Sequence, residues 1–215
     1  NATEDFLNAL KGYMSSKDTL GIISTYNGLG TVKRKLNDTI QSLVYFKKAL
    51  DYSNQLGNLE TIINSYTNVG VGYRNLDSFD IALKYYQTAL DLAHQNRLYH
   101  LEMRINLNMA NIYGDLGDFQ SALKSYYLSL QVCKQVGEEY GMLLNYKNIA
   151  FTYNTIKEYS KAKVFIDSAL IYAEKLKLPG ETAGVYLEYS IYYKGIGNYK
   201  EALDYFQKFY DLKES

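Results

Sequence analysis

The sequence predicts an all-α fold, an α-solenoid built from stacked antiparallel helix pairs. Columns of similar residues recur every 40 positions along nearly the whole chain. Within each repeat the apolar residues are three or four positions apart, which is the spacing of one helix face. The chain has 1 proline in 215 residues, so long uninterrupted helices are allowed. No stretch sustains the alternation of apolar and polar residues that a strand requires, and no sheet is expected.

Three columns illustrate the repeat. Two hold small residues and one holds large, mostly aromatic residues, and all keep one register without a gap. Helix axes come close where side chains are small, and large side chains opposite them fill the remaining space. A single helix pair cannot bury its apolar face alone, so successive pairs must stack. The columns are Gly30, Gly70, Ala110, Ala150 and Ser190; Ser42, Ala82, Ala122, Ala162 and Ala202; and Phe46, Tyr86, Tyr126, Ile166 and Phe206.

The repeats also predict the domain organisation. Turn signals such as Gly57, Gly137 and Pro179-Gly180 separate units that each have room for two helices of about 16–18 residues. Phe6 and Leu10 fall in columns of the second helices, so the first segment is expected to be the second helix of a leading repeat and to cap the stack. The expected parts of one continuous solenoid domain are the half repeat 1–17 and the repeats 18–57, 58–97, 98–137, 138–177 and 178–215.

Composition and charge exclude several classes of function. The 23 basic residues are balanced by 23 acidic residues, whereas a nucleic-acid binder needs a basic excess. The single cysteine, Cys133, excludes an intrachain disulfide and a multi-cysteine metal site. No apolar run approaches the roughly 20 residues of a membrane span. We therefore expect no nucleic-acid binding, membrane insertion, metal or cofactor for this segment.

Catalytic motifs are missing as well. Neither a phosphate-binding G-x-x-x-x-G-K-[ST] loop nor a zinc-binding H-E-x-x-H motif occurs. Gly28-Leu29-Gly30 looks like a fragment of a nucleotide loop, but it lies inside a predicted helix at a packing column. His94 and His100 flank a predicted turn and are expected at the surface. Cys133 falls in a column of small residues and is expected to be buried. The sequence therefore indicates a protein that is not an enzyme.

A known family shares this pattern. The chain resembles the tetratricopeptide repeat through Tyr66, Val69, Gly70, Tyr73, Phe79, Ala82, Tyr86 and Ala89 and their equivalents 40 and 80 residues later. The usual unit has about 34 residues, whereas this one has 40. The proline that commonly ends the second helix is replaced by other residues, so these helices are expected to run on by a turn or more. HEAT-type repeats share a period near 40 but do not predict these columns. The replacements are Asn54, His94, Lys134 and Glu174.

The resemblance implies a right-handed superhelix whose first helices line a concave groove for a peptide or a partner helix. Asn68, Asn108 and Asn148 form a ladder with a spacing of 40 on these helices, which Gly28 and Glu188 interrupt at either end. In long-repeat relatives the matching asparagine often hydrogen-bonds the main chain of an extended peptide. An amide both donates and accepts, which suits a peptide of any sequence. The alternative is that these amides bond only to the neighbouring helix or to water.

The candidate binding residues follow from the same face of the helices. Arg34 and Arg74 recur at one repeat position, and with Arg104 and Lys147 they could make the groove mildly basic and favour an acidic peptide or a free carboxylate. The alternative is an ordinary solvated helix face, which is the interpretation favoured for Arg34. The full candidate set is Asn64, Asn68, Arg74, Arg104, Asn108, Asn111, Lys147, Asn148, Phe151 and Asn154.

The last segment suggests a biological context. Residues 205–215 resemble the final repeat of bacterial signalling proteins in which a tetratricopeptide array precedes a coiled coil, a membrane span and a kinase or DNA-binding module. The resemblance implies a sensor or regulatory segment outside the cytoplasmic membrane, with a cytoplasmic location as the alternative. The expected partner is a peptide, another protein or the protein's own downstream segment. A structural scaffold or self-association module is the second hypothesis.

Overall fold

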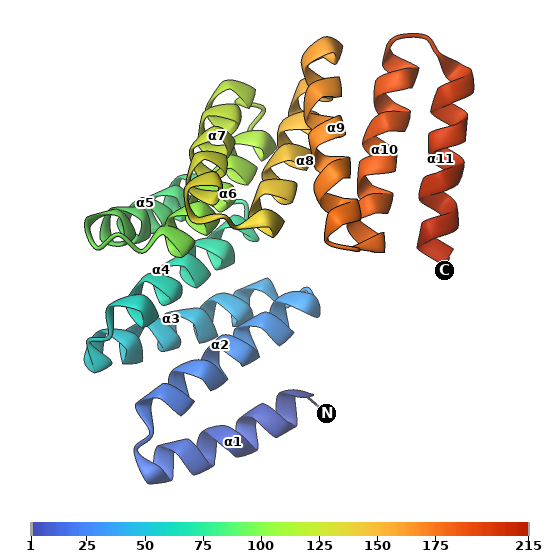
Figure 1. The fold of residues 1–215 in the computed structure, drawn as a ribbon. Coiled ribbons are helices and arrows are strands. Elements are labelled where there is room, and N and C mark those ends of the chain that lie inside the picture. The colour runs from blue at the N-terminus through green and yellow to red at the C-terminus, as the bar shows by residue number, and fades with distance from the viewer. Residues whose placement is uncertain (1, 215) are drawn as a thin grey trace. The chain divides into compact units, whose positions relative to one another are not determined.

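The computed structural model describes residues 2–214, which form eleven α-helices and no strand (Figure 1). The helices are 15 to 18 residues long, close to the length that the 40-residue repeat predicts. They are α1 (Ala2–Ser16), α2 (Thr19–Lys35), α3 (Thr39–Leu56), α4 (Leu59–Arg74), α5 (Phe79–Gln95), α6 (Tyr99–Asp115), α7 (Phe119–Val136), α8 (Glu139–Thr155), α9 (Tyr159–Lys175), α10 (Pro179–Gly195) and α11 (Tyr199–Glu214).

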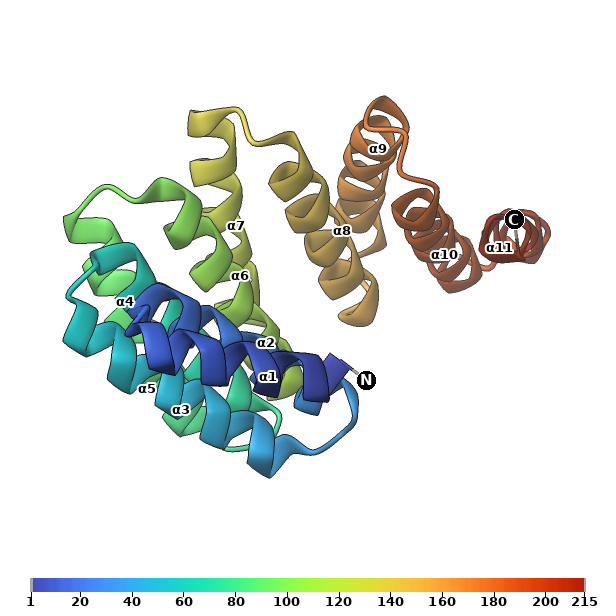
Figure 2. The ribbon, with the colours of Figure 1, turned by 90° about the horizontal axis from the view of Figure 1, so that it is seen from below.

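The chain divides into two compact units, Asn1–Asn108 and Met109–Ser215, with the division inside α6. In the first unit each of α1 to α4 packs on the helix that follows it, and α2 also contacts α4. In the second unit the same holds from α7 to α11, and α8 also contacts α10. Figure 2 shows α10 and α11 side by side, as the contacts require. The predicted all-α architecture of antiparallel helix pairs is confirmed.

The turns recur at regular intervals and share one backbone feature. Each turn between two helices contains one residue with positive φ, the left-handed conformation that reverses the chain direction after a helix. Four are glycines, which adopt it without strain, and the others accept a small local cost. These residues are Lys17, Asn37, Gly57, Asp77, Arg97, Gly117, Gly137, Lys157, Lys177 and Gly197.

Helix starts are fixed by side-chain caps. Asp18, Asp38, Asn58 and Asp118 each accept a hydrogen bond from the backbone N–H three residues later. Asn198 does the same for Glu201, at 3.3 Å. Such caps satisfy backbone donors that have no partner in the first helical turn. Asp38 and Asn198 thus cap α3 and α11.

The second helices end earlier than the sequence predicts. They stop at Leu56, Gln95, Val136 and Lys175, one or two residues beyond the positions of the missing proline rather than a full turn. The reason is the left-handed turn residue, such as Gly57 with φ of 74°, which ends the helix soon afterwards. This repeat is six residues longer than the usual unit. Those residues do not extend the second helix by a full turn beyond the position of the missing proline.

The small and large columns meet as predicted. A Cβ atom added to Gly30 would lie 2.5 Å from Cε1 of Phe46, and one added to Gly70 would lie 2.5 Å from Cε1 of Tyr86. Both rings are buried, with 2 % and 0 % of their surface exposed. The rings of Phe46 and Tyr86 thus rest directly on the backbones of α2 and α4. Glycine is required there for space rather than for a turn.

Aromatic stacks form a second recurring contact between the helices of a pair. The ring of Tyr85 lies 5.9 Å from Tyr66 and 5.4 Å from Tyr73, measured between centroids. Tyr205 makes equivalent contacts with Tyr186 and Tyr193, at 5.8 and 5.4 Å. Each such pair adds about 0.5–1.5 kcal/mol beyond burial of its area. These stacks account for part of the 24 tyrosines.

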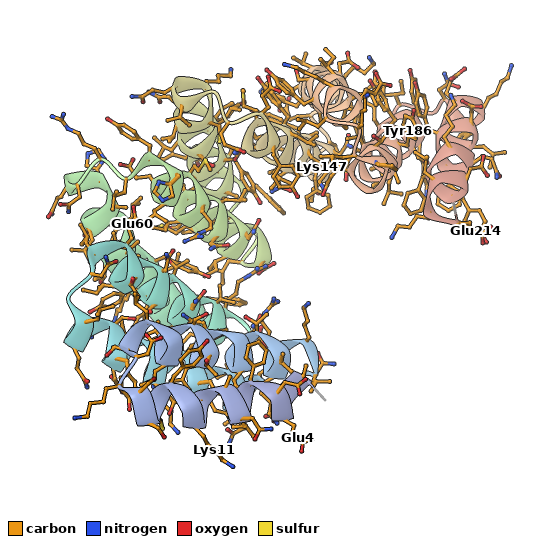
Figure 3. All side chains as sticks on the ribbon, turned by 60° about the horizontal axis from the view of Figure 1, so that its bottom comes forward. Glu4, Lys11, Glu60, Lys147, Tyr186 and Glu214 are labelled. Atoms are coloured by element: carbon orange, nitrogen blue, oxygen red, sulfur yellow. The ribbon has the colours of Figure 1, made fainter. Side chains whose placement is uncertain are left out.

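The leading half repeat packs as expected. Leu10 joins a buried cluster with Ile22 and Tyr26 of α2, and Phe6 packs against the same cluster. The opposite side of α1 faces solvent and carries Glu4 and Lys11, which Figure 3 labels. The prediction that Phe6 and Leu10 hold α1 against the first full repeat is confirmed. None of the helices described for residues 2–214 has the length and apolar character that a membrane crossing requires.

Replacing Gly70 by alanine tests the close approach. The added methyl group would overlap the Tyr86 ring, and such overpacking costs about 1–3 kcal/mol, more than the roughly 1 kcal/mol by which alanine favours a helix. We expect a lower free energy of unfolding in urea. Gly12→Ala is the matched control, because nothing lies within 4 Å of a Cβ at that position. Equal stability of the two variants would contradict this packing of ring on backbone.

Candidate functional site

The candidate residues lie on the first helices of the pairs. Asn64, Asn68 and Arg74 are on α4, and Arg104, Asn108 and Asn111 are on α6. The remaining four are on α8. Within each unit, consecutive first helices touch directly, α2 with α4 and α8 with α10. Side chains on their shared face can therefore bond from one repeat to the next, and this decides which of them stay available to a ligand.

In the first unit, three candidates are engaged by a neighbouring repeat. Asn68 donates from Nδ2 to Oδ1 of Asn27 on α2, at 2.9 Å. The guanidinium of Arg104 donates to Oδ1 of Asn64, which occupies the same column one repeat earlier. Arg74 is half-buried at the end of α4. Burial raises the pKa of the Tyr86 hydroxyl, and the positive charge of Arg74 partly opposes that rise. These contacts support the arrangement of helices in addition to any role with a ligand.

Asn108 and Asn148 differ from the other asparagines. Both are half-buried, and their side-chain amides have no hydrogen-bond partner among residues 2–214. Each amide offers two donors and one acceptor. The two residues lie in different units, Asn108 at the end of the first and Asn148 within the second. A half-buried amide without a protein partner is well suited to bind a group from outside.

Asn111 and Asn154 have structural partners. The hydroxyl of Tyr126 donates to Oδ1 of Asn111 at 2.8 Å, linking α6 to α7. Asn154 is 5 % exposed and donates from Nδ2 to the backbone oxygen of Glu188 at 3.1 Å and to its Oε2 at 3.0 Å. The Oδ1 atom of Asn154 is buried without a partner among the described residues. Asn154 therefore holds α8 and α10 together rather than facing a groove.

The expected basic character does not form around Lys147. Its ammonium pairs with Glu181 of α10, each side chain being about one quarter exposed. The same ammonium acts on Glu188, which is 7 % exposed. Burial raises the pKa of the Glu188 carboxyl, while the Asn154 hydrogen bond and Lys147 oppose that shift. Lys147 is thus accompanied by two carboxylates on the next first helix, and Figure 3 labels it on α8.

Two apolar side chains lie about one turn after Asn148 on α8 and after Glu188 on α10. Phe151 of α8 is 52 % exposed and Ile191 of α10 is 38 % exposed. They occupy the same repeat position on two first helices that touch. The residues predicted from sequence include Phe151 but omit Ile191, Glu181 and the partnership of Glu188. The 40-residue spacing from Phe151 to Ile191 was the signal that could have identified the pair.

Other chemically notable groups fall outside this face. Nδ1 of His94, at the surface, lies 3.4 Å from Oε1 of Glu102, whose side chain is buried. Cys133 is buried as predicted, and desolvation raises the pKa of its thiol. Gly28 and Gly30 lie inside α2 against the rings of Phe6 and Phe46, which confirms packing rather than a nucleotide loop. Among residues 2–214, no three His, Cys, Asp or Glu side chains are grouped as metal ligands would be.

Family comparison agrees with the geometry. Two family models described as tetratricopeptide repeat match the chain, one over residues 21–95 and the other over residues 104–135 and 183–215. The search of curated proteins found no significant sequence match.

Solved structures show the same fold. BtubC from P. vanneervenii aligns with a TM-score of 0.82 and 18 % identity over 99 % of this chain and 87 % of its own. A STAND ATPase with a tetratricopeptide repeat sensor, from Pyrococcus horikoshii, aligns with 0.76 and 17 % over 92 % of this chain. The Rap conjugation gene regulator of plasmid pLS20, in complex with the Phr* peptide, aligns with 0.70 and 16 % over 94 %. This chain spans 31 % and 62 % of the lengths of the last two.

Two asparagine substitutions should separate structural from available amides. In Asn154→Ala the buried Glu188 loses its donor, so the free energy of unfolding should fall by about 1–3 kcal/mol. In Asn148→Ala no protein hydrogen bond is lost, and the change should stay within about 0.5 kcal/mol. Urea unfolding followed by circular dichroism measures both. A destabilisation of Asn148→Ala as large as that of Asn154→Ala would show that Asn148 also has a structural partner.

Proposed function

Because this chain belongs to the tetratricopeptide repeat family, we propose that it is a non-catalytic module that binds an extended peptide on its first helices and regulates another part of a signalling protein. The observation that carries the proposal is an available amide in each unit, that of Asn108 in the first and that of Asn148 in the second. They lie on first helices, at the same repeat position, and no described residue uses their hydrogen-bonding groups. Each amide can pair with one peptide unit of a bound main chain.

The chemistry of the two amides favours recognition of the main chain over recognition of one side chain. A peptide bond offers one donor and one acceptor, and so does each asparagine amide, whichever residue the peptide carries there. The hydrogen bonds would fix the register of the ligand, while its side chains meet Phe151 and other exposed groups of the first helices. Specificity would then come from those side-chain contacts.

The comparisons support this function by analogy. The Rap regulator in the alignment was solved with a bound peptide, and the STAND protein carries its repeats as a sensor. At these sequence identities the alignments show a shared fold and not a shared ligand, so peptide binding and a sensor role are proposals for this chain. The membrane-anchored context expected from the last segment is also a proposal. A regulatory segment fits a chain in which no catalytic constellation is assigned.

Peptide binding provides the direct test. A peptide selected by the protein from a library of random ten-residue sequences should bind more weakly to Asn108→Ala if it binds the first unit and to Asn148→Ala if it binds the second. Loss of hydrogen bonds of about 0.5–1.5 kcal/mol each predicts a two- to tenfold rise in Kd per substitution, measured by fluorescence anisotropy.

Asn96→Ala serves as the control for this titration. Its amide donates to the backbone oxygen of Leu92 at the end of α5, away from the first-helix face, so affinity should not change. Unchanged affinity in both ladder variants would remove Asn108 and Asn148 from the mechanism.

A second function is favoured by the exposed side of α11. Tyr199, Leu203, Phe206 and Tyr210 form a stripe at helical spacing and are 70, 69, 47 and 48 % exposed. Phe46, which occupies the column of Phe206 on the inner helix α3, is buried. A second copy of this chain could cover the stripe. Asp204 and Lys208 pair with each other along α11.

Self-association through α11 is tested by sedimentation velocity over a hundredfold range of concentration. The wild type should shift from monomer to dimer, and Phe206→Glu should remain monomeric because a charge would be buried in the contact. Val164→Glu, at an exposed position on α9, is the control and should dimerise normally. A wild-type chain that stays monomeric at every concentration would end this alternative.

A further inference from the structure

The face shared by α8 and α10 holds an unusual set of charges. Lys147 pairs with Glu181 and also acts electrostatically on Glu188, so one ammonium serves two carboxylates of α10. The next charged side chain along α10, Lys194, is exposed and lies well beyond Glu188. Close to Lys147 the balance is therefore negative by one charge when both carboxyls are ionised. The site lacks one positive charge.

Glu188 also lacks a hydrogen-bond donor. Its Oε2 accepts from Asn154 at 3.0 Å, and no residue among 2–214 donates to its Oε1. The residue is 7 % exposed, so bulk water solvates it poorly. Burial of this kind is costly for a carboxylate unless donors or a cation compensate. Consistent with that cost, burial raises the pKa of this carboxyl.

A pair of exposed apolar side chains lies next to these charges along the two helices. Phe151 and Ile191 are both exposed and come one turn after Asn148 and Glu188 on their respective helices. A turn of helix is about 5.4 Å and an extended peptide advances about 3.3 Å per residue. Residues two apart in an extended peptide can therefore reach the apolar pair and the carboxylate of Glu188 at the same time. The open amide of Asn148 lies at the level of Glu188.

We propose that the α8–α10 face selects a cationic peptide: an extended segment that places a lysine or arginine against Glu181 and Glu188 and an apolar side chain against Phe151 and Ile191. This inference rests on the proposed peptide-binding function and names its ligand class. The ligand cation supplies the missing donor to Oε1 of Glu188 and the missing positive charge. This preference for a cationic peptide is the opposite of the preference for an acidic peptide that Arg74, Arg104 and Lys147 suggest when their hydrogen-bond and ion-pair partners are ignored.

The test uses one peptide library and four proteins. The wild-type chain, Glu181→Gln, Glu188→Gln and the control Glu174→Gln are each used to select from random ten-residue peptides. Glutamine keeps the shape of glutamate and can still accept from Asn154, so the fold should persist, as circular dichroism will check. Glu174 is exposed on α9, a second helix. Peptides kept by the wild type and by Glu174→Gln should be enriched at least threefold in lysine and arginine, and Glu188→Gln should abolish the enrichment.

One selected peptide then identifies the cation. Replacing its lysine by norleucine should raise Kd about tenfold for the wild type and little for Glu188→Gln, since a hydrogen bond to a charged group contributes about 1.5–3 kcal/mol. Acetylating its N-terminus separates a side-chain cation from the terminal amine: we expect affinity to persist. A tenfold loss on acetylation would overturn the assignment to lysine or arginine.

The two levels of the proposal fail in different ways. Peptides that depend on Asn148 but show no cationic enrichment, or keep it in Glu188→Gln, overturn the charge selectivity and leave peptide binding intact. Recovery of no peptide by any of the four proteins overturns both. Loss of enrichment in Glu188→Gln and retention in Glu174→Gln support the inference.

Discussion

The structure depends on one steric constraint, the close approach of the two helices of a pair where a small residue of the first helix faces a large side chain of the second. Phe46 against Gly30 and Tyr86 against Gly70 leave no room for a methyl group. Dispersion contacts and burial are largest when such a gap is closed completely. Later repeats keep a small residue in this column, Ala110, Ala150 and Ser190, opposite a larger side chain, so each pair can pack closely. Within each unit, the first helices consequently meet at a constant register, and their side chains interact between repeats.

This register creates three situations for asparagine at the surface of the first helices. Asn68 bonds to Asn27 in the preceding repeat, Asn154 bonds to Glu188 in the following repeat, and Asn148 bonds to nothing among the described residues. The residue type is the same in each case. The difference comes from what the neighbouring first helix presents at the height of the amide. A repeat protein can thus use one side chain both to fix the spacing of its units and to leave a site open between them.

The sequence predicts the fold well because packing and turns are local or periodic properties. The columns of small and large residues, the caps at Asp38 and Asn198 and the buried position of Cys133 all follow from residue type and spacing. The site is predicted less well, because a long side chain does not obey the period. Lys147 reaches Glu181 instead of Leu187, which occupies its own column in the next repeat. Counting charges column by column therefore misses the pairing that neutralises Lys147.

The electrostatic character of a groove in such a protein is set by contacts between repeats and not by the total charge of its lining residues. Arg104 and Lys147 look like free cations in the sequence, yet each is directed at an acceptor on an adjacent first helix. A ligand therefore meets only the polar groups that these internal pairs leave unused. On α8 and α10 that group is the carboxylate oxygen Oε1 of Glu188, to which no described residue donates. Because a buried carboxylate gains more from an added cation than an exposed one does, this single oxygen outweighs more numerous exposed charges in deciding which peptide binds.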